Sequence, residues 1–329
     1  MPLLTAFAAL DHDAVACRLD ELSLLAFEGA DAATFLQGQL SSDVAALASG
    51  GWQRSSYNSP KGRVLANLVV WRAPEAAGAD CRALVATDLA PGLAKRLRMF
   101  VLRAKVAVRE DARVLLGIAG PRAAEATRAV LGVAPEPERV LAFDGGHALG
   151  FNDGRVLVDT SQERGDALLA AFDAHAVRGD AAVWRYARIR AGVPLITAAT
   201  SDQFVPQALN WDVLGGVSFR KGCYPGQEIV ARMQYLGRLK ERLFAFRVAA
   251  HPPASGTRLY AASFADQACG TVTDAAPHPA GGSALLAVTQ RSAAESDTLH
   301  LEAPDGPALE ALPLPYAVPE PGAPRGRVG

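Results

Sequence analysis

The segment that most restricts the fold of this chain is a turn rich in glycine and proline at residues 219–228, with the sequence FRKGCYPGQE. Gly222 and Gly226 can adopt positive φ angles, whereas Pro225 fixes its own φ and favours an extended residue before it. The residues that follow favour a helix that begins near Gly226. The sequence therefore predicts a rigid loop that presents Cys223 just before a helix.

Two interpretations of Cys223 follow from its neighbours. The thiol is flanked by Arg220 and Lys221 and precedes a helix N-terminus, an environment that stabilises a thiolate and makes a cysteine reactive. Alternatively, Cys223 is a small buried hydrophobic residue, which is the commonest role of a single cysteine. The local sequence leaves both interpretations open.

The run KGCYPGQE at 221–228, followed by Arg232 and the segment YLG at 235–237, closely resembles the signature of the YgfZ family of folate-binding proteins. These proteins are relatives of the glycine-cleavage aminomethyltransferase (T-protein) and are linked to iron-sulfur cluster assembly or repair. A second matching segment, FLQGQL at 35–40 with Asp43, lies where the family carries it, so the resemblance covers most of the chain. The signature residues are Lys221, Gly222, Cys223, Gly226 and Arg232.

The resemblance implies an α+β, aminomethyltransferase-like fold with three modules around a central folate site, the last module being a C-terminal β-barrel. The short strands expected after Lys240, separated by proline and glycine turns, are compatible with such a barrel. We expect an N-terminal α+β module at 1–112, a second α+β module carrying the signature at 113–238, the barrel at 239–316 and a flexible tail at 317–329.

The resemblance also implies tetrahydrofolate or a derivative as the bound cofactor. Trp184 lies where family members place a tryptophan beside folate, and stacking on an indole would add about 1 kcal/mol beyond burial. Alternatively, Trp184 packs in the core, and Gln37 and Gln39 lie on a solvated helix face. The expected cofactor-binding residues are Trp184, Gln37, Gln39, Asn67, Tyr224, Gln227 and Glu228.

Four positions depart from the pattern of the T-proteins or of the family. Ala66 and Asn67 stand where the aminomethyltransferases carry adjacent aspartates, one of them catalytic, and an amide cannot act as a general base. Arg190 stands where a glutamate holds the pterin, and Leu22 stands where some members have a second tryptophan. We therefore expect a folate-binding protein that is not a transferase.

Composition excludes several classes of site and partner. No apolar run approaches the roughly 20 residues that span a bilayer, and the acidic N-terminal region argues against a transit peptide. The net charge of −1 predicts no direct nucleic-acid or membrane partner. The four cysteines are scattered and the six histidines do not pair at ligand spacing, so no metal site is expected. We predict a cytoplasmic protein.

The hydrophobic pattern predicts alternating strands and helices. Asp31 is expected to cap a helix at 32–36, and Ser41 or Ser42 a second short one. A cationic cluster around the helix at 89–98 is either solvated or meets the glutamate tail of a folate; it comprises Lys95, Arg96, Arg98, Arg103 and Lys105. Strands are predicted at 23–28, 52–57, 63–72, 82–87, 104–110, 114–119, 139–143, 155–160, 243–248, 257–260, 270–273, 284–290 and 298–302, and further helices at 122–131, 162–176, 184–191 and from 227.

Three hypotheses for function follow. The first is a folate-binding accessory protein that supports iron-sulfur client or assembly proteins, including tRNA-modifying enzymes, with Cys223 as its functional thiol. The second is a folate-dependent aminomethyl or methyl transferase in which another acid or base replaces the missing aspartate. The third is a structural interaction module in which Cys223 only packs. Nucleotide-binding, zinc-protease and α/β-hydrolase motifs are absent from the sequence.

Overall fold

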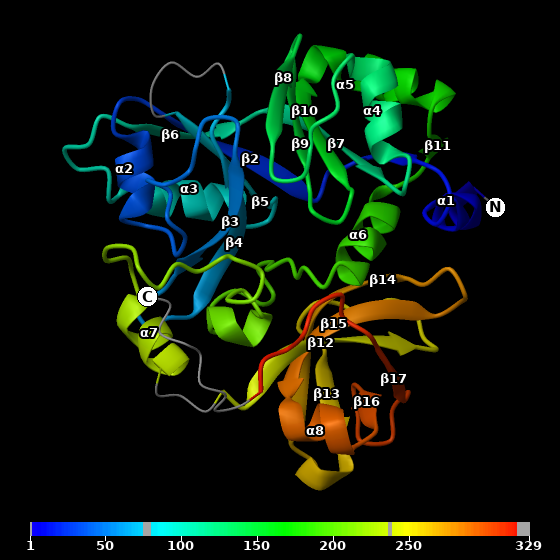
Figure 1. Cartoon of the computed structure of the whole chain (residues 1–329). Coiled ribbons are helices and arrows are strands. Elements are labelled where there is room, and N and C mark those ends of the chain that lie inside the picture. The colour runs from blue at the N-terminus through cyan, green and yellow to red at the C-terminus, as the bar shows by residue number, and fades with distance from the viewer. Residues whose placement is uncertain (1, 75–79, 236–238, 321–329) are drawn as a thin grey trace.

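The computed structural model describes residues 2–74, 80–235 and 239–320. Leu236 and Gly237 of the signature, and the predicted tail from residue 321 onward, lie outside the described residues. Three sheets form the molecule, two in adjoining α/β halves and one in a C-terminal β domain (Figure 1).

The first sheet has five strands in the order β3-β4-β5-β2-β6 and all its pairs are antiparallel. The apolar strand VLANLVVW is largely buried and pairs with its predecessor across a tight turn. The elements of this half are β2 (Leu22–Glu28), α2 (Ala32–Gln37), β3 (Trp52–Asn58), β4 (Val64–Trp71), β5 (Cys81–Ala86), α3 (Ala90–Arg98) and β6 (Ala107–Asp111).

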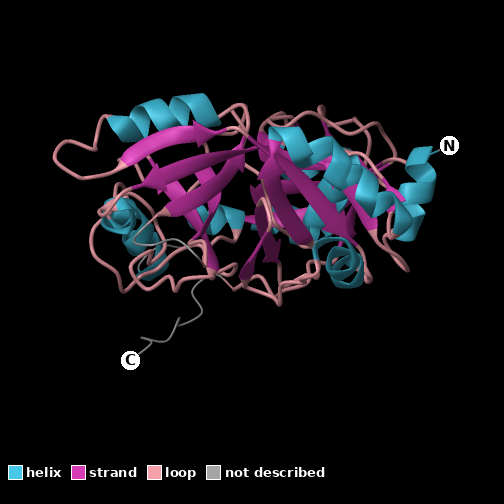
Figure 2. Cartoon of the chain, turned by 90° about the horizontal axis from the view of Figure 1, so that it is seen from above, coloured by secondary structure: helices cyan, strands magenta, loops and turns pink. Residues whose placement is uncertain are grey.

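The second sheet has six strands in the order β11-β1-β7-β10-β9-β8. It includes β1, which comes from the N-terminal segment and pairs with β7, so the start of the chain belongs to this half. Figure 2 shows the strands of the two halves next to one another, with helices flanking them. The elements are α1 (Pro2–Ala9), β1 (Val15–Arg18), β7 (Arg113–Ala119), α4 (Ala123–Leu131), β8 (Val140–Phe143), β9 (Gly146–Gly150), β10 (Val156–Ser161), α5 (Gln162–Ala171), β11 (Val177–Arg178) and α6 (Ala181–Arg190).

The two halves share one kind of turn between a strand and a helix. Gly29 lies between β2 and α2 with φ 127°, and Gly120 lies between β7 and α4 with φ 101°. A Cβ at either glycine would collide with a backbone carbonyl, that of Lys105 or of Asp13. Only glycine therefore fits either turn.

The third sheet is a nearly closed barrel with the strand order β16-β13-β14-β15-β12-β17. Its two end strands meet through the bridge between His300 and Ala308, which confirms the predicted C-terminal barrel. The helix α7 precedes this domain. The elements are α7 (Gln227–Tyr235), β12 (Glu241–Val248), β13 (Arg258–Ala261), β14 (Ala268–Pro277), β15 (Ser283–Gln290), α8 (Arg291–Ser296), β16 (Leu299–Leu301) and β17 (Leu309–Leu312).

The helix α6 lies at the junction of the three sheets (Figure 1) and packs on β1, β7, β14 and β15. Its N-terminus is capped by the carboxylate of Asp180, which accepts a hydrogen bond from Ala182 N at 2.9 Å. Trp184 and Ile189 of this helix belong to the largest buried cluster, together with residues of all three sheets. Among the helices of the described residues, none has the length and apolar character needed to cross a membrane.

Two local predictions are wrong. Asp31 does not cap α2, because its carboxylate accepts a hydrogen bond from Lys105 N at 2.7 Å instead. No second helix follows Ser41, whose hydroxyl donates to Gly216 O at 2.6 Å and accepts from Ser56 N at 2.8 Å. These tertiary contacts take the groups that would have capped helices.

The helix predicted at 162–176 ends early. It stops at Ala171, and a single 3-10 turn at Phe172–Ala174 lets the chain return to pair Val177 with Val15. The elements that sequence patterns did not predict are short or lie at the ends of sheets: α1, β1, β9, β11, α8 and β17.

Candidate functional site

An open cleft of about 890 Å³ lies where the two α/β halves meet the C-terminal segment. This volume falls in the range of about 300–1,000 Å³ that small-molecule sites occupy. The helix α6 forms one wall through Ala187 and Arg190, and Tyr316 closes one side by donating a hydrogen bond to Gly192 O at 2.6 Å. The polar side chains in its lining are Arg54, Glu138, Asn152, Asp153, Arg155, Arg190 and Tyr316.

A small apolar cavity of about 50 Å³ lies behind this cleft and shares Arg54, Arg155 and Val193 with it. Trp184 and Asn67, both predicted cofactor-binding residues, line this inner cavity. A cavity of roughly 150 Å³ holds a single benzene ring. The inner cavity is therefore too small for a pterin, whereas the outer cleft has room for a folate-sized ligand.

Trp184 is enclosed on two sides. A Cβ at Gly117 would lie 2.5 Å from its ring, so the backbone of β7 packs against the indole. On another side the guanidinium carbon of Arg155 lies 4.6 Å from the ring centroid. Arg155 is itself buried and is held by Asp153 at 2.7 Å. The guanidinium of Arg155 thus occupies a position in which a pterin could stack on Trp184. A guanidinium can itself present a planar cationic face to a ligand.

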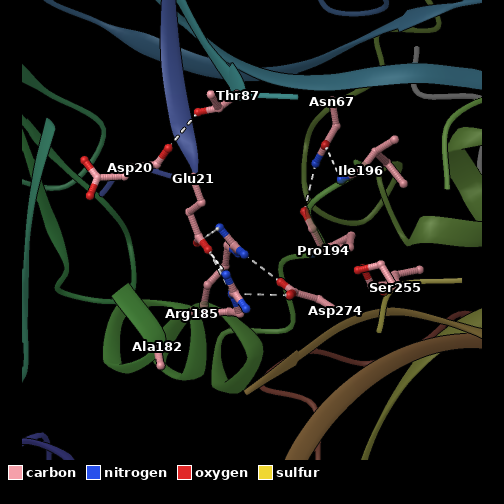
Figure 3. Close-up of polar contacts among 12 residues, drawn as sticks. Asp20, Glu21, Asn67, Thr87, Ala182, Arg185, Pro194, Ile196, Ser255 and Asp274 are labelled. Carbon is pink, nitrogen blue, oxygen red and sulfur yellow. Dashed lines mark hydrogen bonds and ion pairs between the residues drawn. The ribbon is translucent and has the colours of Figure 1, made fainter. Parts of the chain in front are cut away.

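Asn67, the residue at the expected aspartate position, is buried and uses both ends of its amide. It donates to Pro194 O at 2.8 Å and accepts from Ile196 N at 2.8 Å (Figure 3). These bonds hold the segment after α6 against β4. Asn67 therefore has a structural role here, while Ala66 beside it is buried in the core of the first half.

A network of buried ion pairs joins the three modules (Figure 3). Arg188 donates to Asp274 at 2.7 Å and to Glu21 at 3.3 Å, and Arg185 pairs with Glu21. Burial lowers the pKa of Arg188, but the carboxylates of Asp274 and Glu21 outweigh this effect and raise it overall. A second opening of about 540 Å³ lies beside this network. Both carboxylates are already committed to arginines.

The signature loop is anchored by Lys221. Its buried ammonium donates to Leu40 O at 2.6 Å, to Ser42 O at 3.0 Å and to Gln37 O. Burial lowers the pKa of this amine to about 8, with the carboxylate of Asp43 opposing the shift. The structure thus brings the two segments of the family signature, 35–43 and 221–228, into direct contact.

The turn beyond Lys221 packs on the β3–β4 hairpin. Gly226 has φ 76°, and a Cβ there would lie 2.7 Å from Gly62 Cα and collide with Ser59 O. The position of Gly222 does not require the backbone freedom of glycine. Its φ lies outside the positive range, and no atom lies within 4 Å of an added Cβ. Tyr224 is buried below Lys221, whose ammonium lies 5.2 Å from the ring centroid. Burial raises the pKa of Tyr224 to about 12.

The remaining signature residues point outward or brace the loop. Gln227 donates to Lys221 O at 3.4 Å, and Glu228 lies in the first turn of α7, as predicted. Glu228 and Arg232 are exposed. None of the cofactor-binding residues predicted in the two signature segments lines the cleft or the inner cavity; these are Gln37, Gln39, Tyr224, Gln227 and Glu228.

Cys223 is exposed, whereas Cys17, Cys81 and Cys269 are buried. Burial raises the pKa of Cys17 to about 12 and that of Cys81 to about 11. Within 2–74, 80–235 and 239–320 no three histidine, cysteine or acidic side chains are grouped to hold a metal ion. Cys223 is therefore the thiol that a partner can reach in the folded chain.

The predicted site residues thus form two groups. Trp184 and Asn67 lie at the centre of the molecule, and the signature residues form a separate cluster around Lys221. Sequence reasoning did not identify Arg54 or Arg155, which stand between the cleft and the inner cavity. A charged residue inside an otherwise half-buried strand, as Arg54 is in β3, is the signal that could have found the first of them.

The chain is similar over nearly its whole length to curated proteins. It is 33% identical over 308 residues to the tRNA-modifying protein YgfZ of Enterobacter sp. (strain 638), with 92% of this chain and 93% of that protein covered. The proteins of the same name from Sodalis glossinidius (strain morsitans) and Escherichia coli (strain K12 / DH10B) are 32% and 31% identical over 309 residues, with the same shares covered. No protein-family profile matches the chain.

Among solved structures, the glycine cleavage system aminomethyltransferase T from Bartonella henselae superposes with a TM-score of 0.79. The superposition covers 98% of this chain and 92% of that chain, at 18% sequence identity. The fold is therefore aminomethyltransferase-like, as the sequence resemblance implied.

Proposed function

The chain belongs to the YgfZ family, and from this premise we propose that it is a tetrahydrofolate-binding accessory protein that supports iron-sulfur cluster assembly or repair in client enzymes, with Cys223 as its functional thiol. Because its relatives are named tRNA-modifying proteins, the proposed clients include enzymes that modify tRNA. The proposal has three parts, namely a folate site, no transferase chemistry and an accessible thiol.

The observation that carries the folate site is the 890 Å³ cleft at the junction of the modules. Its lining combines apolar side chains such as Val193 and Leu214 with three arginines, Arg54, Arg155 and Arg190. This combination suits a ligand with a flat ring at one end and carboxylates at the other. In this proposal Arg155 and Trp184 form the floor under the ring, and the reduced pterin supplies one-carbon carrier chemistry when bound.

Among the described residues, the lining of the inner cavity beside Asn67 contains no carboxylate, which argues for an accessory role over a transferase. Asn67 is held by two backbone groups and cannot accept a proton in the useful range. Glu21 and Asp274, the carboxylates nearest to Arg188, are bound by arginines. A transferase would need one of them to be released.

The thiol of Cys223 is presented outward by a loop that Lys221 and Gly226 fix in place. Fixing the backbone while exposing the sulfur suits contact with a partner protein. In this role the thiolate either binds iron transiently or attacks a disulfide of a client, forming a mixed disulfide and releasing the other client sulfur as a thiolate.

Two measurements test the proposal. Tetrahydrofolate should bind the purified, reduced protein saturably under anaerobic conditions. The gene should also restore the activity of an iron-sulfur enzyme in a bacterium that lacks its own relative, whereas Cys223→Ser, expressed to the same level, should not. No binding by the wild type together with full rescue by Cys223→Ser would refute the proposal. Formation of methylenetetrahydrofolate from an aminomethyl donor would establish the transferase instead.

A further inference from the structure

We propose that Arg54 binds a carboxylate of the glutamate moiety of folate, so that the cleft selects glutamylated folates. This inference rests on the proposed function, and its test separates the two. It assigns a ligand-binding role to a residue of β3 that lies outside both signature segments.

The position of Arg54 suits this role. Its side chain lines both the outer cleft and the inner cavity, so its guanidinium stands at the boundary between them. The guanidinium carbon lies 5.2 Å from the ring centroid of Trp52, which fixes its direction. Its one hydrogen bond among the described residues is a long one, from NH1 to Leu214 O at 3.4 Å. Most of its donors are therefore available to a ligand.

The described carboxylates around the cleft make no direct ion pair with Arg54. Arg155 is paired with Asp153 at 2.7 Å, and Arg190 with Asp11 at 2.8 Å. Glu138 accepts from Asn152 at 2.9 Å. Throughout the part of the chain that the structure describes, no carboxylate lies within ion-pair distance of Arg54.

Burial and a neighbouring arginine both destabilise the charge on Arg54. Burial, and after it the positive charge of Arg155, lower the pKa of Arg54, while Asp153, Tyr316 and Glu138 oppose them. Two arginines therefore repel one another at the entrance to the inner cavity. A bound anion would relieve this repulsion and could accept two parallel hydrogen bonds from the guanidinium.

The glutamate moiety is the anionic part of folate, since its ring system carries no negative charge near neutral pH. The sequence leaves open whether the cationic cluster around α3 is solvated or contacts the glutamate tail. The cluster lines neither the cleft nor the inner cavity; it comprises Lys95, Arg96, Arg98, Arg103 and Lys105. Arg96 and Arg98 of this cluster bond within the first half, to Tyr57 and Val108 O. We therefore assign the contact with the glutamate moiety to Arg54 and not to this cluster.

The test compares tetrahydrofolate with tetrahydropteroate, which lacks the glutamate, by calorimetry on the full chain. The variants are Arg54→Met, which keeps the apolar stem over Trp52, and Arg164→Met, an arginine with a carboxylate partner that lines neither the cleft nor the inner cavity. We expect Arg54→Met to weaken tetrahydrofolate binding by about tenfold or more, the effect of a charged hydrogen bond. Tetrahydropteroate should bind the wild type and Arg54→Met equally, and Arg164→Met should leave tetrahydrofolate binding unchanged.

Three outcomes separate the claims. Equal tetrahydrofolate binding by wild type and Arg54→Met would overturn the role of Arg54 and leave the folate site intact. If Arg54→Met weakened the binding of both compounds tenfold, Arg54 would support the site without contacting the glutamate moiety. This result would also overturn the proposal. No binding of either compound by the wild type would overturn the folate site and, with it, this inference. Inorganic phosphate as competitor should displace tetrahydrofolate only at millimolar concentration, because one ion lacks the ring contacts.

Discussion

The guanidinium carbon of Arg155 lies 4.6 Å from the ring centroid of Trp184, and Arg155 lines the outer cleft whereas Trp184 does not. This contact changes the expected role of Trp184, because a ligand in the cleft meets Arg155 first. The tryptophan then acts as a rigid, apolar support for a stacking arginine. The same arginine separates the outer cleft from an inner cavity that is too small for a pterin.

Gly226→Ala should destabilise the fold by about 2 kcal/mol or more, because the new methyl group would collide with the β3–β4 turn at a positive φ. Gly222→Ala is the matched control in the same loop. No atom lies within 4 Å of its added Cβ, so its free energy of unfolding should change by less than about 0.5 kcal/mol. Urea denaturation of both variants measures the difference. Equal effects would show that the signature loop is not packed as described.

Arg188→Met should lower the free energy of unfolding by about 3–5 kcal/mol, because it leaves the buried carboxylate of Asp274 with only the longer contact to Arg185 at 3.9 Å. Arg190 lies two residues further along α6 and forms an exposed ion pair with Asp11. Arg190→Met should therefore lower the free energy of unfolding by less than about 1 kcal/mol. The double variant Arg188→Met with Asp274→Leu should recover most of the loss, since it removes both charges. A mild effect of Arg188→Met alone would mean that water reaches Asp274.

Lys221 should make stability depend on pH in the alkaline range. The pKa of Lys221 is about 8 in the folded chain and about 10.4 in the unfolded chain. Between these two pH values the unfolded chain binds more protons than the folded chain. The contribution of Lys221 to the free energy of unfolding therefore rises with pH. The stability of wild type minus that of Lys221→Met should therefore increase by about 1–2 kcal/mol from pH 7.5 to pH 9.5. Denaturation at both pH values measures this difference. A difference that falls with pH would contradict the lowered pKa.

One thiol should react quickly in the folded protein. Cys223 is exposed and the other three cysteines are buried, so alkylation at neutral pH should label one site per chain, and denaturation should release the rest. Cys223→Ala should abolish the fast phase and change the free energy of unfolding by less than about 0.5 kcal/mol. Fast labelling of a second residue would show that a buried cysteine becomes accessible.

Periodicity and turn residues predicted most strands and helices, because elements such as β4 and α4 carry strong local patterns. The failures have tertiary causes. Asp31 and Ser41 have the chemistry of helix caps, but Lys105 N takes the carboxylate of the first and Gly216 O and Ser56 N take the hydroxyl of the second. Such competition cannot be read from neighbouring residues.

The site was predicted in part, for a similar reason. The signature run predicted a rigid loop that presents Cys223 just before a helix and left its exposure open. The partners of Lys221 are backbone carbonyls of a segment some 180 residues away, at Leu40 and Ser42. Backbone acceptors leave no trace in side-chain identity. The stacking of Arg155 on Trp184 likewise depends on how β10 and α6 pack, which local sequence does not encode.

The most direct test of the account is tetrahydrofolate binding by wild type and two variants of α6, Ala187→Trp and Ala182→Trp. Both alanines are half-buried, and only Ala187 lines the cleft. We predict saturable binding by wild type and Ala182→Trp, and binding at least about tenfold weaker by Ala187→Trp, with all three proteins folded by circular dichroism. Equal binding by all three would place the ligand elsewhere, and no binding by the wild type would contradict the central claim.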